Sequence, residues 1–240
     1  STTAGNVAVG HDAGNDITTG DRNTILGTFV ADALTTGYQN TALGYHALGA
    51  DTQGATAVAV GYQALGTQNY GAATTNYNTA VGYNAAVYLT SGLYNTIIGG
   101  LAGDALTDAD RNVAVGTSSL AADTLGSRST ALGYGALNVQ NFTTATTTHN
   151  TAVGYYAGVS VTTGIQNTIV GATAGDSLTD ADYNVAVGYA SLAGDTLGSR
   201  AVARGYAALT SQHFTTATNS YNAAVGYAAG NQVTTGTGNT

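Results

Sequence analysis

The six residues Asn78–Tyr83 read N-T-A-V-G-Y, and the same six letters return at Asn150–Tyr155. The glycine of each such unit recurs along the whole chain, at residues 10, 27, 44, 61, 82, 99, 116, 133, 154, 171, 188, 205 and 226. The intervals between successive glycines run 17, 17, 17 and 21, and this order then repeats, so that every fourth unit closes a longer super-repeat. A short, regular period is typical of a solenoid, in which each repeat forms one coil.

The composition argues against helix. The 240 residues include 34 Gly and no Met, Pro, Cys or Trp, all 13 acidic residues are Asp, and all 5 basic residues are Arg. The helix formers Glu, Lys and Met are therefore missing, while Thr, Val and Tyr, which favour strands, are plentiful.

Two short apolar stretches per unit indicate the coil. Residues 6–10 and 112–116 alternate with the period of a strand. A second stretch places an aliphatic residue before Thr, as at Leu34, Leu89 and Val161, and predicts a second strand. We therefore predict an all-β fold, a parallel β-solenoid of about 13 coils. It forms one continuous segment, 1–240, with super-repeats at approximately 6–77, 78–149 and 150–221 and a partial one at 222–240.

The recurring asparagine precedes each strand, where its amide can donate and accept hydrogen bonds along the stack. A structural ladder is favoured over a ligand site. Its members are Asn6, Asn23, Asn40, Asn78, Asn95, Asn112, Asn150, Asn167, Asn184 and Asn222. The glycine is interpreted as a corner that only Gly enters at low cost.

Both faces of the strand are apolar. The residue before each glycine, such as Val9 or Leu26, is expected to face the interior, and Ile25 or Ala42 to lie on the opposite face. A strand that is apolar on both faces is normally covered on both, so self-association is expected. Arg204 breaks this pattern, because an unpaired guanidinium facing inward is costly.

Tyrosines follow many of the corner glycines. Packing between chains is favoured over a sugar-binding surface, which remains the alternative. The candidate contact residues are Tyr45, Tyr62, Tyr83, Tyr134, Tyr155, Tyr189, Tyr206 and Tyr227.

Every fourth unit carries an insertion, within 70–76, 142–148 and 214–220. These segments are interpreted as loops that project once per super-repeat. A contact role and a tolerated insertion are equally consistent with the pattern.

Clustered aspartates are candidate calcium ligands, because calcium binds carboxylate oxygens. They are Asp108, Asp110, Asp180 and Asp182. The matching places of the first super-repeat, Thr36 and Tyr38, hold no acid, so solvated turn aspartates are favoured and no cofactor is expected.

Several function classes are disfavoured. A net charge of −8 opposes binding to nucleic acid, and no apolar run is long enough to insert in a membrane. The four histidines share no repeat position, so we expect no enzyme. A row of threonines, interrupted by valines, leaves an ice-binding β-solenoid as an alternative, and the rows of tyrosines leave a polysaccharide-binding one.

The units N-V-A-V-G at 6–10 and 184–188, with a small residue three places after the glycine, resemble the head repeats of YadA-like trimeric autotransporter adhesins and similar repeats of phage tail fibres. The resemblance implies a left-handed parallel β-roll of three chains, that is, a homotrimer, and a non-catalytic adhesive role in an extracellular fibre, on a cell or virion surface, with a cell-surface or glycan receptor. End-to-end polymerisation is the other possible form of self-association, because the coils at both ends of the segment have unpaired strand edges. The repeats here are longer than those of the adhesin heads.

Overall fold

The computed structural model describes residues 5–240, which form strands and turns but no helix. The chain is a parallel β-solenoid of about 13 turns, with strands about 17 residues apart, so the predicted fold class is confirmed. No helix in this part of the chain has the length and hydropathy needed to span a membrane.

Two compact units make up the chain, one ending at Thr117 and the other beginning at Ser118. In the first unit the main parallel sheet runs in the order β1-β2-β3-β5-β7-β8-β9. Its strands are β1 (Val7–Val9), β2 (Thr24–Leu26), β3 (Thr41–Leu43), β5 (Val58–Val60), β7 (Thr79–Val81), β8 (Thr96–Ile98) and β9 (Val113–Val115). Successive strands pair in register, for example Thr79 with Thr96 and Val81 with Ile98.

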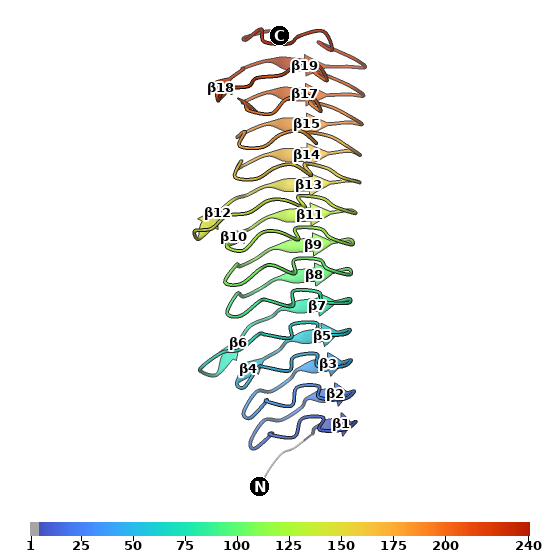
Figure 1. The fold of residues 1–240 in the computed structure, drawn as a ribbon, viewed down its shortest axis with the longest axis vertical. Helices are drawn as coiled ribbons and strands as arrows, with labels where there is room; N and C mark the ends of the chain where they lie inside the picture. The colour runs from blue at the N-terminus through green and yellow to red at the C-terminus, as the bar shows by residue number, and fades with distance from the viewer. Residues whose placement is uncertain (1–4) are drawn as a thin grey trace. The chain divides into compact units, whose positions relative to one another are not determined.

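The second unit repeats this arrangement in the order β11-β13-β14-β15-β17-β19. Its strands are β11 (Thr130–Leu132), β13 (Thr151–Val153), β14 (Thr168–Val170), β15 (Val185–Val187), β17 (Val202–Arg204) and β19 (Ala223–Val225). Within each unit the strands lie one above the next (Figure 1).

The long coils, which carry the insertions, add short side sheets to this arrangement. These are the parallel pairs β4 (Gly54–Ala55) with β6 (Thr74–Thr75), β10 (Gly126–Ser127) with β12 (Thr146–Thr147), and β16 (Gly198–Ser199) with β18 (Thr218–Asn219). In Figure 1 these pairs lie on the side of the coils away from the main strands. The inserted residues are therefore ordered against the preceding coil.

The predicted second strand is wrong. The stretch around Leu34, Leu89 and Val161 lies in turns, and the aliphatic side chains themselves are fully buried. The reason is local backbone geometry: the residues two and four places after the corner glycine have positive φ, as at His46 and Leu48 (both 55°). Such residues curl the chain, so only isolated bonds join the coils here, for example Thr35 N–H to Thr52 O (2.8 Å).

The corner glycines have φ between 130° and 143°. At Gly99 an added Cβ would lie 2.6 Å from backbone atoms of Gly116 in the next coil. Glycine is therefore required here both by backbone conformation and by the close approach of successive coils, as the sequence predicts.

Two kinds of coil fill the interior differently. In one kind, the fourth residue after the corner glycine is small, as at Gly103, and the seventh is a buried aliphatic residue such as Leu106. The two are in close contact, because a Cβ added to Gly103 would lie 2.8 Å from Leu106 Cδ1. Where the fourth residue is a buried leucine, as at Leu65, the seventh is polar, as at Gln68. Polar groups therefore enter the core at fixed places in each super-repeat.

Candidate interaction surface

The repeated motif alternates between interior and surface. In the coil of β7, Asn78 and Ala80 are buried, whereas Thr79 and Val81 are partly exposed and Tyr83 is exposed. The same alternation holds in the coil of β13. Each such coil therefore presents Thr, Val and Tyr on one outward strip.

The outward face of the main strands carries an aliphatic column, formed by the residue before each corner glycine. Its exposed members are Val9, Leu26, Leu43, Ile98 and Val225, and the half-buried ones are Val60, Val81, Val115, Leu132, Val153, Val170 and Val187. We call this set the aliphatic column. Because the parallel strands are in register, its members follow one another along each unit as an apolar strip.

This finding reverses the predicted orientation of the strand. The sequence interpretation turns Val9 and Leu26 inward, but the structure buries the middle residue, such as Ile25 (0% exposed) or Ala42 (1%). Both faces are apolar, so hydrophobicity alone does not decide between them. The middle residue is Ala in most strands and Ile in β2, β8 and β14.

Arg204 is no exception once the orientation is corrected. It interrupts the aliphatic column, is exposed, and pairs in the sheet with Val187 and Val225. Its guanidinium therefore stays in solvent, without the penalty expected for an inward side chain.

Tyrosines form a ridge along one side of the aliphatic column. In the first unit Tyr45, Tyr62 and Tyr83 stack in sequence, with ring centroids 5.4 and 5.3 Å apart and interplanar angles of 11° and 14°. In the second unit Tyr189, Tyr206 and Tyr227 form the same kind of stack, at 5.3 and 5.2 Å. Tyr134 and Tyr155 stack at 5.7 Å. The predicted contact tyrosines therefore lie together in three stacks, whose ring faces are largely occupied by one another.

A second row flanks the strands on the other side, at the residue before each ladder asparagine. Tyr77 stacks on Tyr94 (5.7 Å), and Arg111 lies over the Tyr94 ring at 4.9 Å. In the second unit Arg200 lies over Tyr183 at the same distance. The aliphatic column is thus bordered by aromatic and cationic side chains.

The predicted ladder asparagines lie at the base of the strands, and all but the first are buried. The Asn23 side chain accepts a hydrogen bond from Asn40 N–H (2.9 Å) and donates one to Gly37 O (2.9 Å). Each amide thereby satisfies the two ends of one tight turn in the next coil. The residue before the ladder asparagine takes the left-handed conformation, as at Gln39 (φ 58°).

Each long coil lacks the ladder asparagine, and a residue of its inserted loop accepts the hydrogen bond in its place. Ala57 stands where the ladder asparagine would be, and Asn76 Oδ1 instead accepts the bond from Asn78 N–H (2.9 Å). In the second unit Thr148 Oγ1 takes this role toward Asn150 N–H (3.5 Å).

A buried Asp–Gln–Asn network, which the sequence reasoning missed, fixes each loop. Asp123 Oδ1 accepts bonds from Gly126 N–H (3.0 Å) and Phe142 N–H (3.1 Å), and its Oδ2 accepts one from Gln140 Nε2 (2.5 Å). Gln140 Oε1 in turn accepts a bond from Asn150 Nδ2 (2.8 Å). The same network recurs once in each super-repeat, as Asp51–Gln68–Asn78 and as Asp195–Gln212–Asn222. The sequence signal that could have revealed this network is the return of both the Asp and the Gln once in every super-repeat.

Burial raises the pKa of Asp51 and of Asp123, although hydrogen bonds from the glutamines and from backbone N–H groups oppose the shift. Burial also raises the pKa of Asp104 and of Asp176. The hydrogen bonds of Asp51 and Asp123 hold the loops in place.

The candidate calcium ligands are engaged in bonds between coils. Asp108 Oδ1 accepts a bond from Ser91 Oγ (2.8 Å), and Asp180 Oδ1 one from Thr163 Oγ1 (2.7 Å). Asp110 and Asp182 accept bonds from the backbone N–H groups of Leu93 and Ile165, both at 2.8 Å. Within residues 5–240 there is no group of three or more His, Cys, Asp or Glu side chains that could hold a metal ion.

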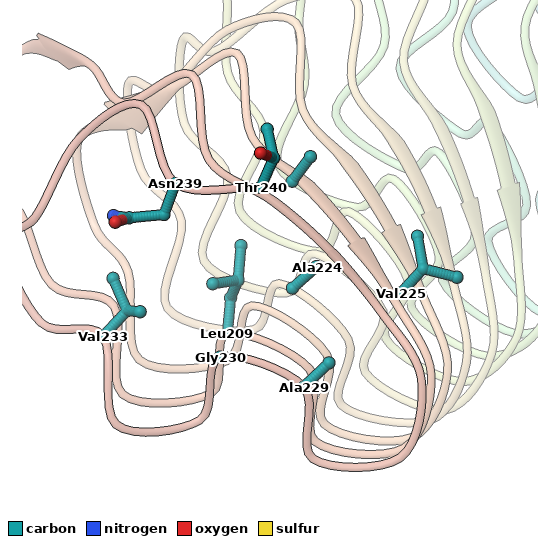
Figure 2. A pocket seen from close by; sticks show the side chains of 9 residues that line it. Leu209, Ala224, Val225, Ala229, Gly230, Val233, Asn239 and Thr240 are labelled. Atoms are coloured by element: carbon teal, nitrogen blue, oxygen red, sulfur yellow. The ribbon is translucent and has the colours of Figure 1, made fainter.

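One pocket, of about 290 Å³, opens over the last coil of the second unit. Figure 2 shows Leu209, Ala224, Ala229 and Val233 around it. These are interior positions of the coil, so the pocket lies over the core of this coil, and Asn239 and Thr240 also line it.

The chain was compared with protein-family models, with curated proteins and with solved structures. None of the three comparisons gave a match. The resemblance to adhesin head repeats therefore remains a prediction from the motifs.

Proposed function

We propose that the chain is a non-catalytic structural segment of an extracellular fibre, which self-associates side by side through the aliphatic column. The homotrimer implied by the repeat motifs is the favoured form. The observation that supports this proposal is the run of exposed and half-buried Val, Leu and Ile on the outward strand face of each unit, interrupted at Arg204 in the second. Contiguous apolar strips of this kind mark interaction sites on soluble proteins.

A second copy of the chain is the favoured occupant, because the column and its aromatic borders repeat along the strands and would match the same repeat in another chain. Protein interfaces combine an apolar core with an enrichment in Tyr and Arg. In the fibre, adhesion to a cell-surface or glycan receptor would fall to the projecting loops.

The test compares three matched positions. Val60, Leu132 and Arg204 occupy the same place in successive super-repeats, and the third shows that arginine is compatible with the fold there. Sedimentation velocity should show a discrete trimer for the wild type, a shift toward monomer for Val60→Arg/Leu132→Arg, and a tighter assembly for Arg204→Val. A wild type that stays monomeric at high concentration would refute self-association, and an assembly indifferent to these variants would refute this interface.

An ice-binding role is the second candidate, because Thr24, Thr41, Thr79, Thr96, Thr151 and Thr168 all stand on the outward face. Valines interrupt this row of threonines, and Val, Leu or Ile stands where a second threonine would widen it. Thermal hysteresis by the monomer would favour this reading, and its absence in concentrated protein would exclude it. A polysaccharide-binding platform is less favoured, because the stacked tyrosines cover one another's faces.

A further inference from the structure

Exposed tyrosines are held in contact with one another on successive coils, which is an unusual arrangement in a chain with 16 tyrosines and no cysteine. We propose that the tyrosine stacks are oxidative cross-linking sites, at which peroxide and a one-electron peroxidase catalyst join tyrosines of neighbouring coils through a carbon–carbon bond. The stacks lie within a single chain, so this inference does not depend on self-association.

The geometry brings reactive rings together. Ring centroids within the two triple stacks are 5.2–5.4 Å apart, with interplanar angles of 9–16°. In the third stack Tyr134 and Tyr155 are joined by Tyr156, whose centroid lies 5.2 Å from Tyr134 and 4.4 Å from Tyr155. Two phenoxyl radicals formed in one stack would therefore be neighbours from the moment they form.

The stacked rings are also accessible. The six tyrosines of the triple stacks are between 43% and 81% exposed. Neighbouring rings cover one another's inner faces, and the stacking leaves the ring edges and hydroxyl groups uncovered. The carbons beside the hydroxyl, where tyrosyl radicals couple, lie on those edges, and surface side chains can adjust their rotamers to bring two such carbons together.

The chemistry balances with peroxide as the oxidant. Each of two tyrosines gives up one electron and one proton to form a phenoxyl radical, and the radicals join through a new bond between ring carbons ortho to the hydroxyls. The hydrogen on each of those carbons then moves to its oxygen, which restores both phenols. In total the pair loses two electrons and two protons, and one hydrogen peroxide accepts them and becomes two water molecules.

A cross-link of this kind would connect consecutive coils. Tyr45 and Tyr62 follow the corner glycines of two successive coils, and Tyr83 follows that of the next. A covalent bond from one coil to the next closes a loop in the unfolded chain, which reduces its conformational freedom as a disulfide does. The stacks would thereby supply the covalent reinforcement that a chain without cysteine lacks.

The test treats dilute full-length chain with hydrogen peroxide and a haem peroxidase, and follows dityrosine fluorescence and cross-linked peptides by mass spectrometry. Tyr62→Phe/Tyr206→Phe keeps the rings but removes the phenols at the centres of the two triple stacks. These two phenols take part in four of the six stacked pairs. Tyr88→Phe/Tyr221→Phe is the matched control, because both tyrosines are 58% exposed and neither stacks on another ring in the described structure.

We expect intramolecular links 45–62, 62–83, 189–206 and 206–227 in the wild type and in the control variant. The centre variant should lose all four, with a corresponding fall in fluorescence. Links formed mainly by Tyr88 or Tyr221, equal fluorescence in the two variants, or no intramolecular link between stacked residues would each overturn the proposal.

Discussion

At the scale of the residue, the fold depends on two residue types, glycine and asparagine, each at a fixed position in the coil. The corner glycines allow successive coils to approach until their backbones touch, and the ladder asparagines satisfy both ends of the next turn. Buried backbone groups left without partners are costly, so these two residue types recur for physical reasons.

Replacing Gly99 by Ala should destabilise the first unit by more than about 3 kcal/mol, because the new Cβ meets the Gly116 backbone and φ is 137°. Gly71 is the control, because a Cβ there has no neighbour within 4 Å and its φ lies outside the left-handed region. Urea unfolding should show little change for Gly71→Ala. Equal stability of the two variants would contradict the close contact between coils.

Asn95→Ala should reduce the free energy of unfolding by about 2–4 kcal/mol, because it orphans Ala109 O and Asn112 N–H, which Asn95 bonds at 2.7 and 2.9 Å. Asn6→Ala, at a less buried ladder position, should cost less. Hydrogen exchange at the turn 109–112 provides a local measurement. Unchanged protection there would show that the ladder contributes little.

The sequence was sufficient to predict the glycine corners and the asparagine positions, since each has a distinctive letter at a fixed interval. It was insufficient to orient the strand. Leu26 and Ile25 are equally apolar, and only the folded coil shows that Ile25 is the buried one.

At the scale of the element, the buried Asp–Gln–Asn network sets the position of each long-coil loop. The sequence predicted where the loops occur, because the interval between corner glycines lengthens in every fourth unit. It did not predict the hydrogen bonds that hold the loops. In the sequence Asp51, Asp123 and Asp195 look like exposed aspartates of turns, and only the structure shows that they are buried. The absence of a second strand could not be predicted either. Strand propensity does not show that the residues two and four places after the corner glycine take the left-handed conformation.

This network predicts a pH dependence. The pKa of folded Asp51 and Asp123 lies above the ordinary value of 3.8, so the folded chain holds these protons more tightly than the unfolded chain. Their contribution to stability is full below the unfolded pKa, is lost as pH rises through the folded pKa, and is absent at neutral pH. Asp104 and Asp176 act in the same direction.

The urea midpoint of the wild type should therefore rise when the pH is lowered from about 7 to about 4. Asp51→Asn/Asp123→Asn should show a smaller rise, because two of the titrating groups are gone. A wild-type midpoint that falls on acidification, or a variant that keeps the full rise, would contradict the assignment.

At the scale of the whole molecule, repetition produces a surface as well as a scaffold. The alternation within N-T-A-V-G-Y sends Asn and Ala into the coil and Thr, Val and Tyr outward, and register multiplies this strip along each unit. The letters could indicate that an apolar face needs a partner. Only the burial of each residue in the structure shows which residues form this face. That its partner is a second copy of the chain is the central proposal.

That proposal is tested most directly by single cysteines in a chain that has none of its own. Val153→Cys places a thiol on the aliphatic column, and Thr144→Cys places one on the exposed loop of the same unit. Thiol labelling across a range of protein concentrations should become slower at residue 153 as the chains associate, and stay constant at residue 144. Labelling at residue 153 that does not depend on concentration would contradict association through the strand face.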